Sequence, residues 1–303
     1  MTRRSTVLPR ERVHVVASRP AAYWLLLVAL CGGAARASDH DDTPLLKTLP
    51  RPEARITDLY GFTRGGKLVL ALCANPAIPP GKTSYTFSPE ETFTIFIDNN
   101  STVRFDDPEE LARYGGTIEQ PNTIHEDITF VVRFDSMEQA HLDVDGLPQN
   151  ARNGISLFTG LRDDPFIRGP RIGRNVAAIV IELPLPVVLR GQPTLLIWAT
   201  SRTDFILGRF QDLGGRALRS QFVENDLVNT LPPNRHLREL GVPPDVIIYD
   251  TSRPAAFPNG RELTDDVVDL VADPRVLAND APFPTQNDVP FLTTFPYLAP
   301  PHP

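Results

Sequence analysis

The sequence predicts a mainly β protein: an antiparallel, jelly-roll-like β-sandwich followed by a C-terminal extension of short helices and long loops. Three observations carry this prediction. Short runs of β-branched and aromatic residues, bounded by proline, glycine and asparagine, recur through the first 200 residues. In the same region no helical periodicity competes with them, apart from one turn at 107–115. Many of the 31 prolines lie toward the C-terminus, which is typical of extended connections.

The first predicted strands form a hairpin. Residues 55–62 (RITDLYGF) and 67–76 (KLVLALCANP) flank the turn TRGG, whose two glycines favour a tight reversal. Residues 91–100 (ETFTIFIDNN) alternate hydrophobic and polar side chains and end in Asp-Asn-Asn. Short acid and amide side chains bond to their own backbone, so this ending favours a turn. Further strands are predicted at 127–135, 175–184 and 193–202.

After residue 205 the pattern changes. Residues 214–232 have hydrophobic spacing that a helix would accept, and 261–274 form a second predicted helix. In the second helix Thr264 is the expected N-cap, and acidic residues occupy the first turn. No flexible linker precedes this part. We therefore expect one domain, 38–303, with a sandwich at about 55–205 and a helical or extended wrap at about 206–303.

Residues 1–37 have the three parts of a secretory signal peptide. A segment rich in arginine precedes a 14-residue apolar run at 21–34, and the small-residue site ARA follows at 35–37. The apolar run is too short to cross a bilayer, which takes roughly 20 residues. We expect export to the periplasm or the extracellular space, with no membrane anchor after cleavage.

The charge of the exported chain limits its partners. Of the 30 basic and 37 acidic residues, six and one lie in 1–37, which leaves a net charge of −12. This balance argues against nucleic acid and anionic membranes, and we expect a small ligand or an envelope protein as partner. Cleavage also leaves Cys73 as the single cysteine, so no internal disulfide is possible. Its apolar surroundings indicate a small buried hydrophobic residue.

Several segments together resemble a known family. SDHDDTPLL at 38–46, RITDLYGF, FTIFIDNN, PDVIIYDTSRPAAFPNGRELTDDVVDL at 244–270 and NDVPFLTTFPYLAPPHP at 287–303 are similar, in order, to landmarks of the DUF4331 family of exported bacterial proteins. Members begin with a stretch similar to Ser-His-Arg-Glu-Ala-Pro, whereas this chain keeps a histidine and an acid there and lacks the arginine. The resemblance implies export and assigns no activity, since the family is named for its unassigned function.

The first candidate site is the acidic N-terminal stretch. Asp39, His40, Asp41 and Asp42 offer a borderline nitrogen and hard oxygens, which suit a divalent cation. Neighbouring residues of an extended chain point to opposite sides, so at most two of the four can face one ion. One interpretation is a solvated terminus before Pro44, and this is the favoured one. The other is a segment that docks on the sandwich, where His40 completes a site.

Two further oxygen-rich stretches are interpreted as turns. Asp98 begins an Asp-Asn-Asn strand end that lacks the register of a calcium loop. Asp143 and Asp145 alternate before Gly146, but no acid closes a calcium loop downstream. Turn formation explains both stretches more simply than ligand binding does.

PNGRELTDD at 258–266 is the most distinctive polar stretch. Capping accounts for Asp265 and Asp266, whereas Asp269 lies deeper in the predicted helix. Asp265 and Asp269 are four residues apart on one helix face and repel each other unless a cation or an arginine lies between them. Arg253 and Arg261 are the expected ion-pair partners.

No catalytic signature for a serine hydrolase, a zinc protease or a nucleotide-binding enzyme is present, and the histidines are scattered singly. This favours a binding or structural module over an enzyme. We expect that module to hold a divalent cation, calcium or zinc. The candidate ligands are His40, Asp41, Asp58, Asp98, Asp266 and Asp269, which would have to converge in the fold. The alternatives are a metal-dependent hydrolase of the cell envelope and an envelope component without a ligand.

Overall fold

The computed structural model describes residues 39–303 except 41, 44, 45, 47, 79, 80, 83, 84, 86, 168–172, 206, 207, 220–226 and 272–284. By their internal contacts, Met1–Arg36 and Ala37–Pro303 are separate units, and every described residue belongs to the second. The predicted signal peptide therefore lies outside the described residues. Among the residues that are described, no helix is both long and apolar enough to cross a membrane.

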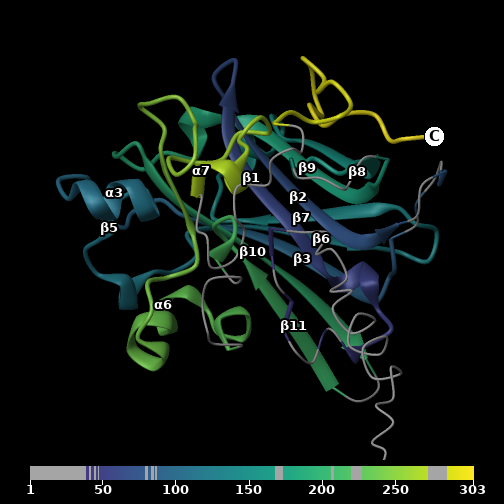
Figure 1. Cartoon of the computed structure of the whole chain (residues 1–303), viewed down its shortest axis with the longest axis horizontal. Coiled ribbons are helices and arrows are strands. Elements are labelled where there is room, and N and C mark those ends of the chain that lie inside the picture. The colour runs from purple at the N-terminus through teal and green to yellow at the C-terminus, as the bar shows by residue number, and fades with distance from the viewer. Residues whose placement is uncertain are drawn as a thin grey trace, which may run out of the picture. The chain divides into compact units, whose positions relative to one another are not determined.

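The described residues form 12 strands, all paired antiparallel, so the predicted fold class is confirmed. One sheet has the order β1-β2-β9-β8; the other has the order β11-β10-β3-β6-β7, with β12 paired to β10 as well; β4 and β5 pair on their own (Figure 1). The strands are β1 (Ile56–Arg64), β2 (Lys67–Ile78), β3 (Glu91–Asp98), β4 (Val103–Arg104), β5 (Thr117–Ile118), β6 (Ile128–Phe134), β7 (Ala140–Asp145), β8 (Ser156–Asp163), β9 (Asn175–Pro184), β10 (Thr194–Phe205), β11 (Gly208–Gly214) and β12 (Ile247–Asp250).

The described helices are short, and all but η1, which precedes β1, and α7, which follows β12, lie in the connections between strands. The α-helices are α3 (Pro108–Tyr114), α4 (Gln149–Arg152), α6 (Pro233–Arg235) and α7 (Val267–Val271). The 3₁₀ and π segments are η1 (Pro52–Ala54), η2 (Pro121–Thr123), η3 (Leu185–Val187), η4 (Val228–Thr230) and η5 (His236–Leu240).

The main core lies between the two sheets, because alternate residues of a strand face opposite sides. Along β2, Leu68, Leu70 and Leu72 enter this core, while Val69 and Cys73 face the other way. The partner sheet contributes aromatic and branched side chains from β3 and β6. Cys73 is free and fully buried, as predicted.

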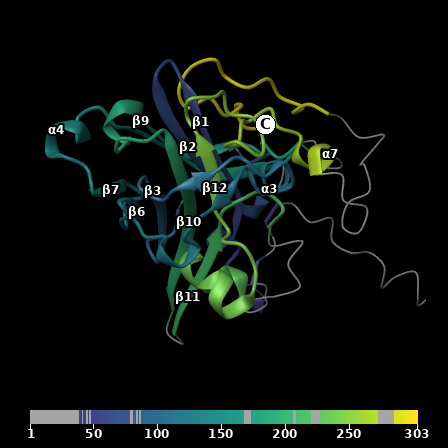
Figure 2. The same ribbon diagram turned by 90° about the vertical axis from the view of Figure 1, so that its left-hand side faces the viewer.

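Both outer faces of the sandwich are also covered. The C-terminal segment, yellow in Figure 1, places Tyr297 and Leu298 against the outer face of the β1-β2-β9-β8 sheet, and the Tyr297 ring meets Phe62 edge-on at 6.0 Å. On the other sheet, Trp198 and Ile248 belong to a cluster that residues around β4 and β5 cover. Figure 2 shows β10 and β11 side by side in this sheet.

The predicted strands all form, with ends shifted by a few residues. The turn in TRGG places Gly65 and Gly66 at positive φ, 55° and 77°, where glycine is favoured. Six strands were not predicted: β4, β5 and β12 have two to four residues, and β7, β8 and β11 have six to eight. The calcium-like stretch at 141–150 is one of these cases: it is mostly strand β7, and a turn begins only at Gly146.

The helices differ more from expectation. The predicted turn at 107–115 is helix α3, with Asp107 as N-cap and Gly115 in the left-handed conformation at its end. The predicted helix at 214–232 is wrong at its start, because Gly214 ends β11, and 220–226 lie outside the described residues. In the last predicted helix the backbone N–H of Asp269 bonds to Asp266, so Asp266 rather than Thr264 caps α7.

Candidate functional site

The N-terminal stretch is buried, so the favoured interpretation of a solvated terminus is wrong. Asp39, His40 and Asp42 are only 4–7% exposed. Asp39 accepts the N–H of Leu218 through its backbone oxygen and forms an ion pair with Arg261. The segment is therefore docked on the folded sandwich, as the second interpretation predicted.

The side chain of His40 contacts strand β11. Its Nε2 lies 2.9 Å from Oδ2 of Asp212, and Asn229 lies on the same side, with its amide nitrogen 3.4 Å from Nε2. A Cβ at Gly214 would lie 3.5 Å from Nδ1 of His40 and 3.2 Å from Ile56, so this glycine lets the imidazole approach β11 closely.

Asp42 completes a three-residue group with His40 and Asp212. One donor atom from each side chain lies within 4.8 Å of the other two, and the three side chains are only 6%, 5% and 0% exposed. The Nε of Arg55 donates to Oδ2 of Asp42 at 2.7 Å. We call His40, Asp42 and Asp212 the His40 cluster.

The charges in the His40 cluster are strongly coupled. Burial alone would lower the pKa of His40, but the Asp212 carboxylate, through its charge and its hydrogen bond, raises it to about 10, helped by Asp42 and Asp245. Burial raises the pKa of Asp212, and the charge of His40 opposes that rise. Without a cation, His40 therefore carries a proton at neutral pH. Because a metal binds neutral imidazole, it would have to displace this proton.

Two carboxylate oxygens of the cluster have no hydrogen-bond partner among the described residues. These are Oδ1 of Asp42 and Oδ1 of Asp212, both buried. Leaving such an acceptor unsatisfied costs about 1–3 kcal/mol, more when it is charged. One nitrogen and two carboxylates are a ligand set for a divalent transition metal, so the cluster could hold a cation.

Asp58, one of the predicted ligands, belongs to a neighbouring ion-pair group instead. Arg261, 1% exposed, donates to Oδ1 of Asp58 at 3.0 Å and pairs with Asp39. Its guanidinium lies 4.0 Å from the centre of the Tyr60 ring. Asp58 and Asp39 therefore neutralise a buried arginine, and Asp58 is not part of the His40 cluster.

Asp98 stabilises its own turn. Its carboxylate accepts hydrogen bonds from the backbone N–H groups of Asn100, Ser101 and His125 and from the Ser101 hydroxyl. These bonds agree with the turn interpretation. The same turn borders a polar cavity of about 220 Å³. Asp41, the remaining N-terminal candidate, lies outside the described residues.

The acids around α7 do not join the His40 cluster either. Asp265 accepts the backbone N–H groups of Phe257 and Glu262 at 2.9 and 2.8 Å, and Asp266 caps the helix toward Asp269. The expected ion pairs with arginine are absent among the described residues, because Arg253 pairs with Asp250 and Arg261 pairs with Asp39 and Asp58. The predicted convergence of His40, Asp58, Asp98 and Asp266 is therefore wrong.

A second histidine group was not predicted. The Nε2 atom of His302 lies 3.1 Å from carboxylate oxygens of both Asp163 and Asp288, and these donor atoms could also hold a cation. Burial raises the pKa of Asp163 to about 7, although a hydrogen bond from Asn287 lowers it in part. The side-chain amide of Asn175 donates to the backbone oxygen of His302 and accepts the N–H of His302. These two bonds anchor His302 to the first residue of β9.

Sequence reasoning thus found one residue of the His40 cluster and weighed a second, Asp42. It missed Asp212, which follows His40 by 172 positions and lies on a strand that was not predicted. The only signal for Asp212 is a single acid in a weakly alternating run before two glycines. Comparison of the chain with protein-family models and with curated proteins gave no match.

Proposed function

We propose that this protein is an exported binding module whose N-terminal segment is fastened to the sandwich by a divalent cation in the His40 cluster. The observation that carries the proposal is the pair of buried, unpartnered oxygens of Asp42 and Asp212 beside the His40 imidazole. A cation there would satisfy both oxygens and link residues 40–42 to β11. The resemblance to the DUF4331 family supports export and leaves the ligand open.

The donor set favours zinc or manganese over calcium. Calcium takes six to eight oxygen ligands, whereas a mixed nitrogen and carboxylate set suits first-row transition metals. Ligands at about 2.0–2.1 Å from a tetrahedral zinc stand roughly 3.3 Å apart. Donor atoms that already lie within 4.8 Å of one another need only small side-chain movements to reach this arrangement.

Burial favours a structural role over hydrolysis. A catalytic zinc site keeps one open position for water and substrate, whereas a structural site is closed. The side chains of the His40 cluster are at most 6% exposed. The hydrolase alternative would require a path for substrate to these three residues.

Metal analysis of the purified full-length chain tests the proposal. We expect one equivalent of bound metal, and a rise in melting temperature when zinc or manganese is added back to chelated protein, because a ligand at 100 times its Kd stabilises by about 2.7 kcal/mol. His40→Ala and Asp212→Asn should abolish both effects. His141→Ala and Asp143→Asn are matched controls on the exposed strand β7 and should change neither.

The proposed cation site would be overturned if the wild-type protein held less than about a tenth of an equivalent of metal and its melting temperature did not change when metal was added. In that case the His40 cluster would be an imidazolium–carboxylate ion pair alone. Metal that survives in both cluster variants would place the cation elsewhere, and the Asp163, Asp288 and His302 group would be the next to test.

A further inference from the structure

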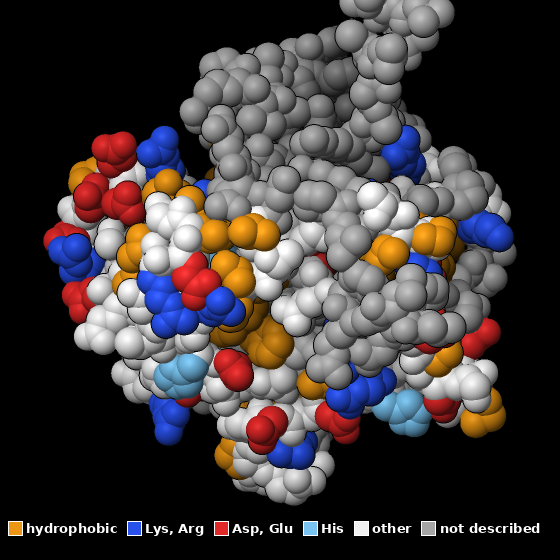
Figure 3. All heavy atoms as spheres, turned by 90° about the horizontal axis from the view of Figure 1, so that it is seen from below, with side chains coloured by type: hydrophobic (Ala, Val, Ile, Leu, Met, Phe, Trp, Pro, Cys, Tyr) orange, Lys and Arg blue, Asp and Glu red, His pale blue; other side chains and the backbone are white. Residues whose placement is uncertain are grey.

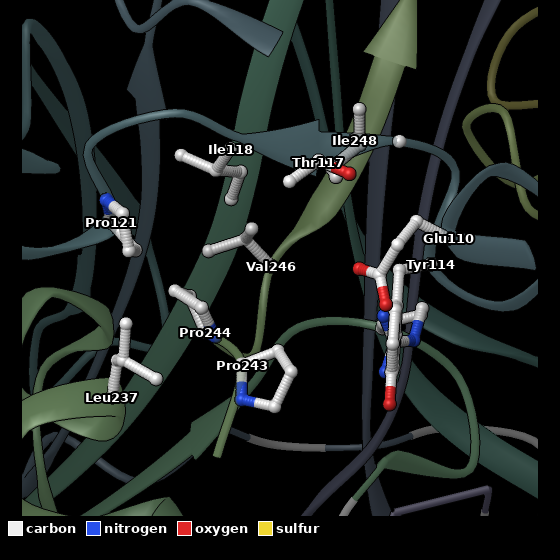
Figure 4. Close-up of a pocket in the computed structure, with 12 residues that line it drawn as sticks. Glu110, Tyr114, Thr117, Ile118, Pro121, Leu237, Pro243, Pro244, Val246 and Ile248 are labelled. Atoms are coloured by element: carbon white, nitrogen blue, oxygen red, sulfur yellow. The ribbon is translucent and has the colours of Figure 1, made fainter. Parts of the chain in front are cut away.

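A cavity of about 140 Å³ lies over the outer face of the six-stranded sheet, and none of its lining residues belongs to the His40 cluster. Its walls come from α3, β5, η2, η5, the segment after β11 that carries Arg216, and the segment leading into and beginning β12. On the face drawn in Figure 3, hydrophobic side chains gather beside a group of basic and acidic ones. Figure 4 shows the lining residues, which differ in chemistry from one end of the cavity to the other.

Most of the wall is apolar. Pro121, Leu237 and Pro244 lie together at one end, with Ile118 and Val246 beside them (Figure 4). Rigid prolines and branched side chains give this end a fixed shape, and Val246 is 1% exposed. Leu237 is 42% exposed, so the cavity reaches the surface there.

The opposite end is polar and carries an arginine. Glu110 and Tyr114 lie there in Figure 4, and Arg216 stacks on Tyr114 with its guanidinium carbon 4.4 Å from the ring centre. The backbone of Arg216 is held by Asp245, whose Oδ1 accepts its N–H at 2.8 Å. The side chain is thereby oriented while its donors remain available to a ligand.

The Arg216 guanidinium has no ion-pair partner within 4.0 Å among the described residues, although it lines the cavity together with Glu110. A second arginine, Arg219, lies 6.0 Å from the same Tyr114 ring and donates to the backbone oxygen of Pro243 at 2.9 Å. Burial and the neighbouring Arg219 lower the pKa of Arg216 to about 10, so it stays cationic at neutral pH. The charges of Glu110 and Asp245 oppose this lowering, but neither acid is paired with the Arg216 guanidinium, so an anion can bind its donors.

We propose that this cavity binds a small aromatic monocarboxylate, with its ring against the apolar end and its carboxylate on Arg216. A cavity of about 150 Å³ accepts a benzene ring, so this cavity has room for one ring, and the acidic arm would extend beyond it along the polar wall to Arg216. Arginine binds carboxylates through two parallel N–H donors, which fixes the orientation of the acid. None of the residues that line the cavity belongs to the His40 cluster, so the proposal does not require a cation there.

Ligand-observed NMR with phenylacetate on the full-length chain tests this site, with phenylacetamide as the uncharged analogue of equal shape. For a ligand of this size we expect a Kd of the order of 0.1–1 mM. The amide should bind at least about tenfold more weakly, since it lacks the charge that pairs with Arg216. Arg216→Met should remove that preference, and exposed Arg190→Met is the matched control.

A second set of variants tests the same site by filling the cavity. Leu237→Trp places a ring in the mouth and should abolish binding, whereas Leu270→Trp, at another exposed leucine, should not. Equal binding of acid and amide, or an unchanged Kd in Arg216→Met that is folded by circular dichroism, would overturn the proposal. No saturable signal at millimolar phenylacetate would overturn it too. A failed metal analysis leaves these outcomes unchanged, so the two proposals can fail separately.

Discussion

At the scale of single residues, burial decides which of the many acids have unusual chemistry. Asp98 is fully buried, yet four hydrogen bonds satisfy it within its own turn. Asp212 is equally buried but keeps one unpartnered oxygen beside His40. Both are short acids next to turn residues in the sequence. Only the donors that surround each carboxylate distinguish a structural acid from a candidate ligand.

Glu91, at the start of β3, provides a pH test at this scale. Its side chain is 1% exposed, and burial raises its pKa from 4.5 to about 7, although Thr203 and Arg51 oppose the rise. The folded protein therefore holds a proton that the unfolded chain releases. This difference in proton binding contributes to the free energy of unfolding. We expect the contribution to be complete below pH 4.5 and to be lost as the pH rises through 7, and its size to be at most about 3 kcal/mol.

Urea unfolding of wild type and Glu91→Gln between pH 4 and 8 measures this loss. Glutamine cannot ionise, so the variant should lose less stability over that interval than the wild type. Glu90→Gln is the control, because Glu90 also pairs with Arg51 but its side chain is 53% exposed. An identical pH slope in wild type and Glu91→Gln would contradict the expectation.

At the scale of elements, the docked N-terminal segment depends on strands that are distant in the sequence. Asp39 reaches Arg261, which also holds Asp58 of β1, and His40 reaches Asp212 of β11. Gly215, directly after β11, leaves no room for a side chain, since a Cβ there would lie 2.3 Å from the backbone oxygen of Asp245. The segment is thus held by the ion pairs of Asp39 and His40, and the Gly215 contact packs the end of β11 against the backbone of Asp245.

Arg261→Met tests how strongly the segment is held. It leaves Asp39 and Asp58 buried without their cation, and breaking a buried ion pair by removing one partner costs about 3–5 kcal/mol. We expect that loss in urea unfolding, together with faster proteolysis around residues 39–48. Arg253→Met removes a partly exposed pair and should cost less than about 1 kcal/mol. Equal losses in the two variants would contradict the role of Arg261.

At the scale of the whole molecule, the sandwich is hydrophobic on its outer faces as well as between its sheets. Val69 and Cys73 of β2 point outward, and the C-terminal residues Tyr297 and Leu298 complete their burial. The 31 prolines suit this arrangement, because an extended cover needs no ladder of backbone hydrogen bonds. The C-terminal segment is therefore part of the core and not an appendage.

Leu298→Ala should uncover this outer core. Leu298 is fully buried, and replacing such a leucine by alanine costs about 2–5 kcal/mol. In a Cys31→Ala background Cys73 is the single thiol, so its labelling rate under native conditions reports the opening of the cover. We expect faster labelling in Leu298→Ala and no change in Leu270→Ala, which alters an exposed leucine. Unchanged labelling in Leu298→Ala would contradict this role.

The sequence by itself determined the fold class, six of the twelve described strands, the first hairpin, helix α3 and the burial of Cys73. These follow from local rules, since alternation, glycine turns and caps act over a few residues. Short strands such as β4 and β12 were missed because runs of two to four residues carry too little pattern to separate from loops.

Only the tertiary structure decided which polar residues meet. His40 and Asp212 are 172 positions apart, and Asp163 and His302 are 139 positions apart. Because carboxylates look alike in sequence, their partners depend on which strands pair and which faces are covered. The same holds for the cavity at Arg216, whose walls come from six segments. Local sequence patterns thus determine the secondary-structure elements, and long-range packing determines which residues form the candidate sites.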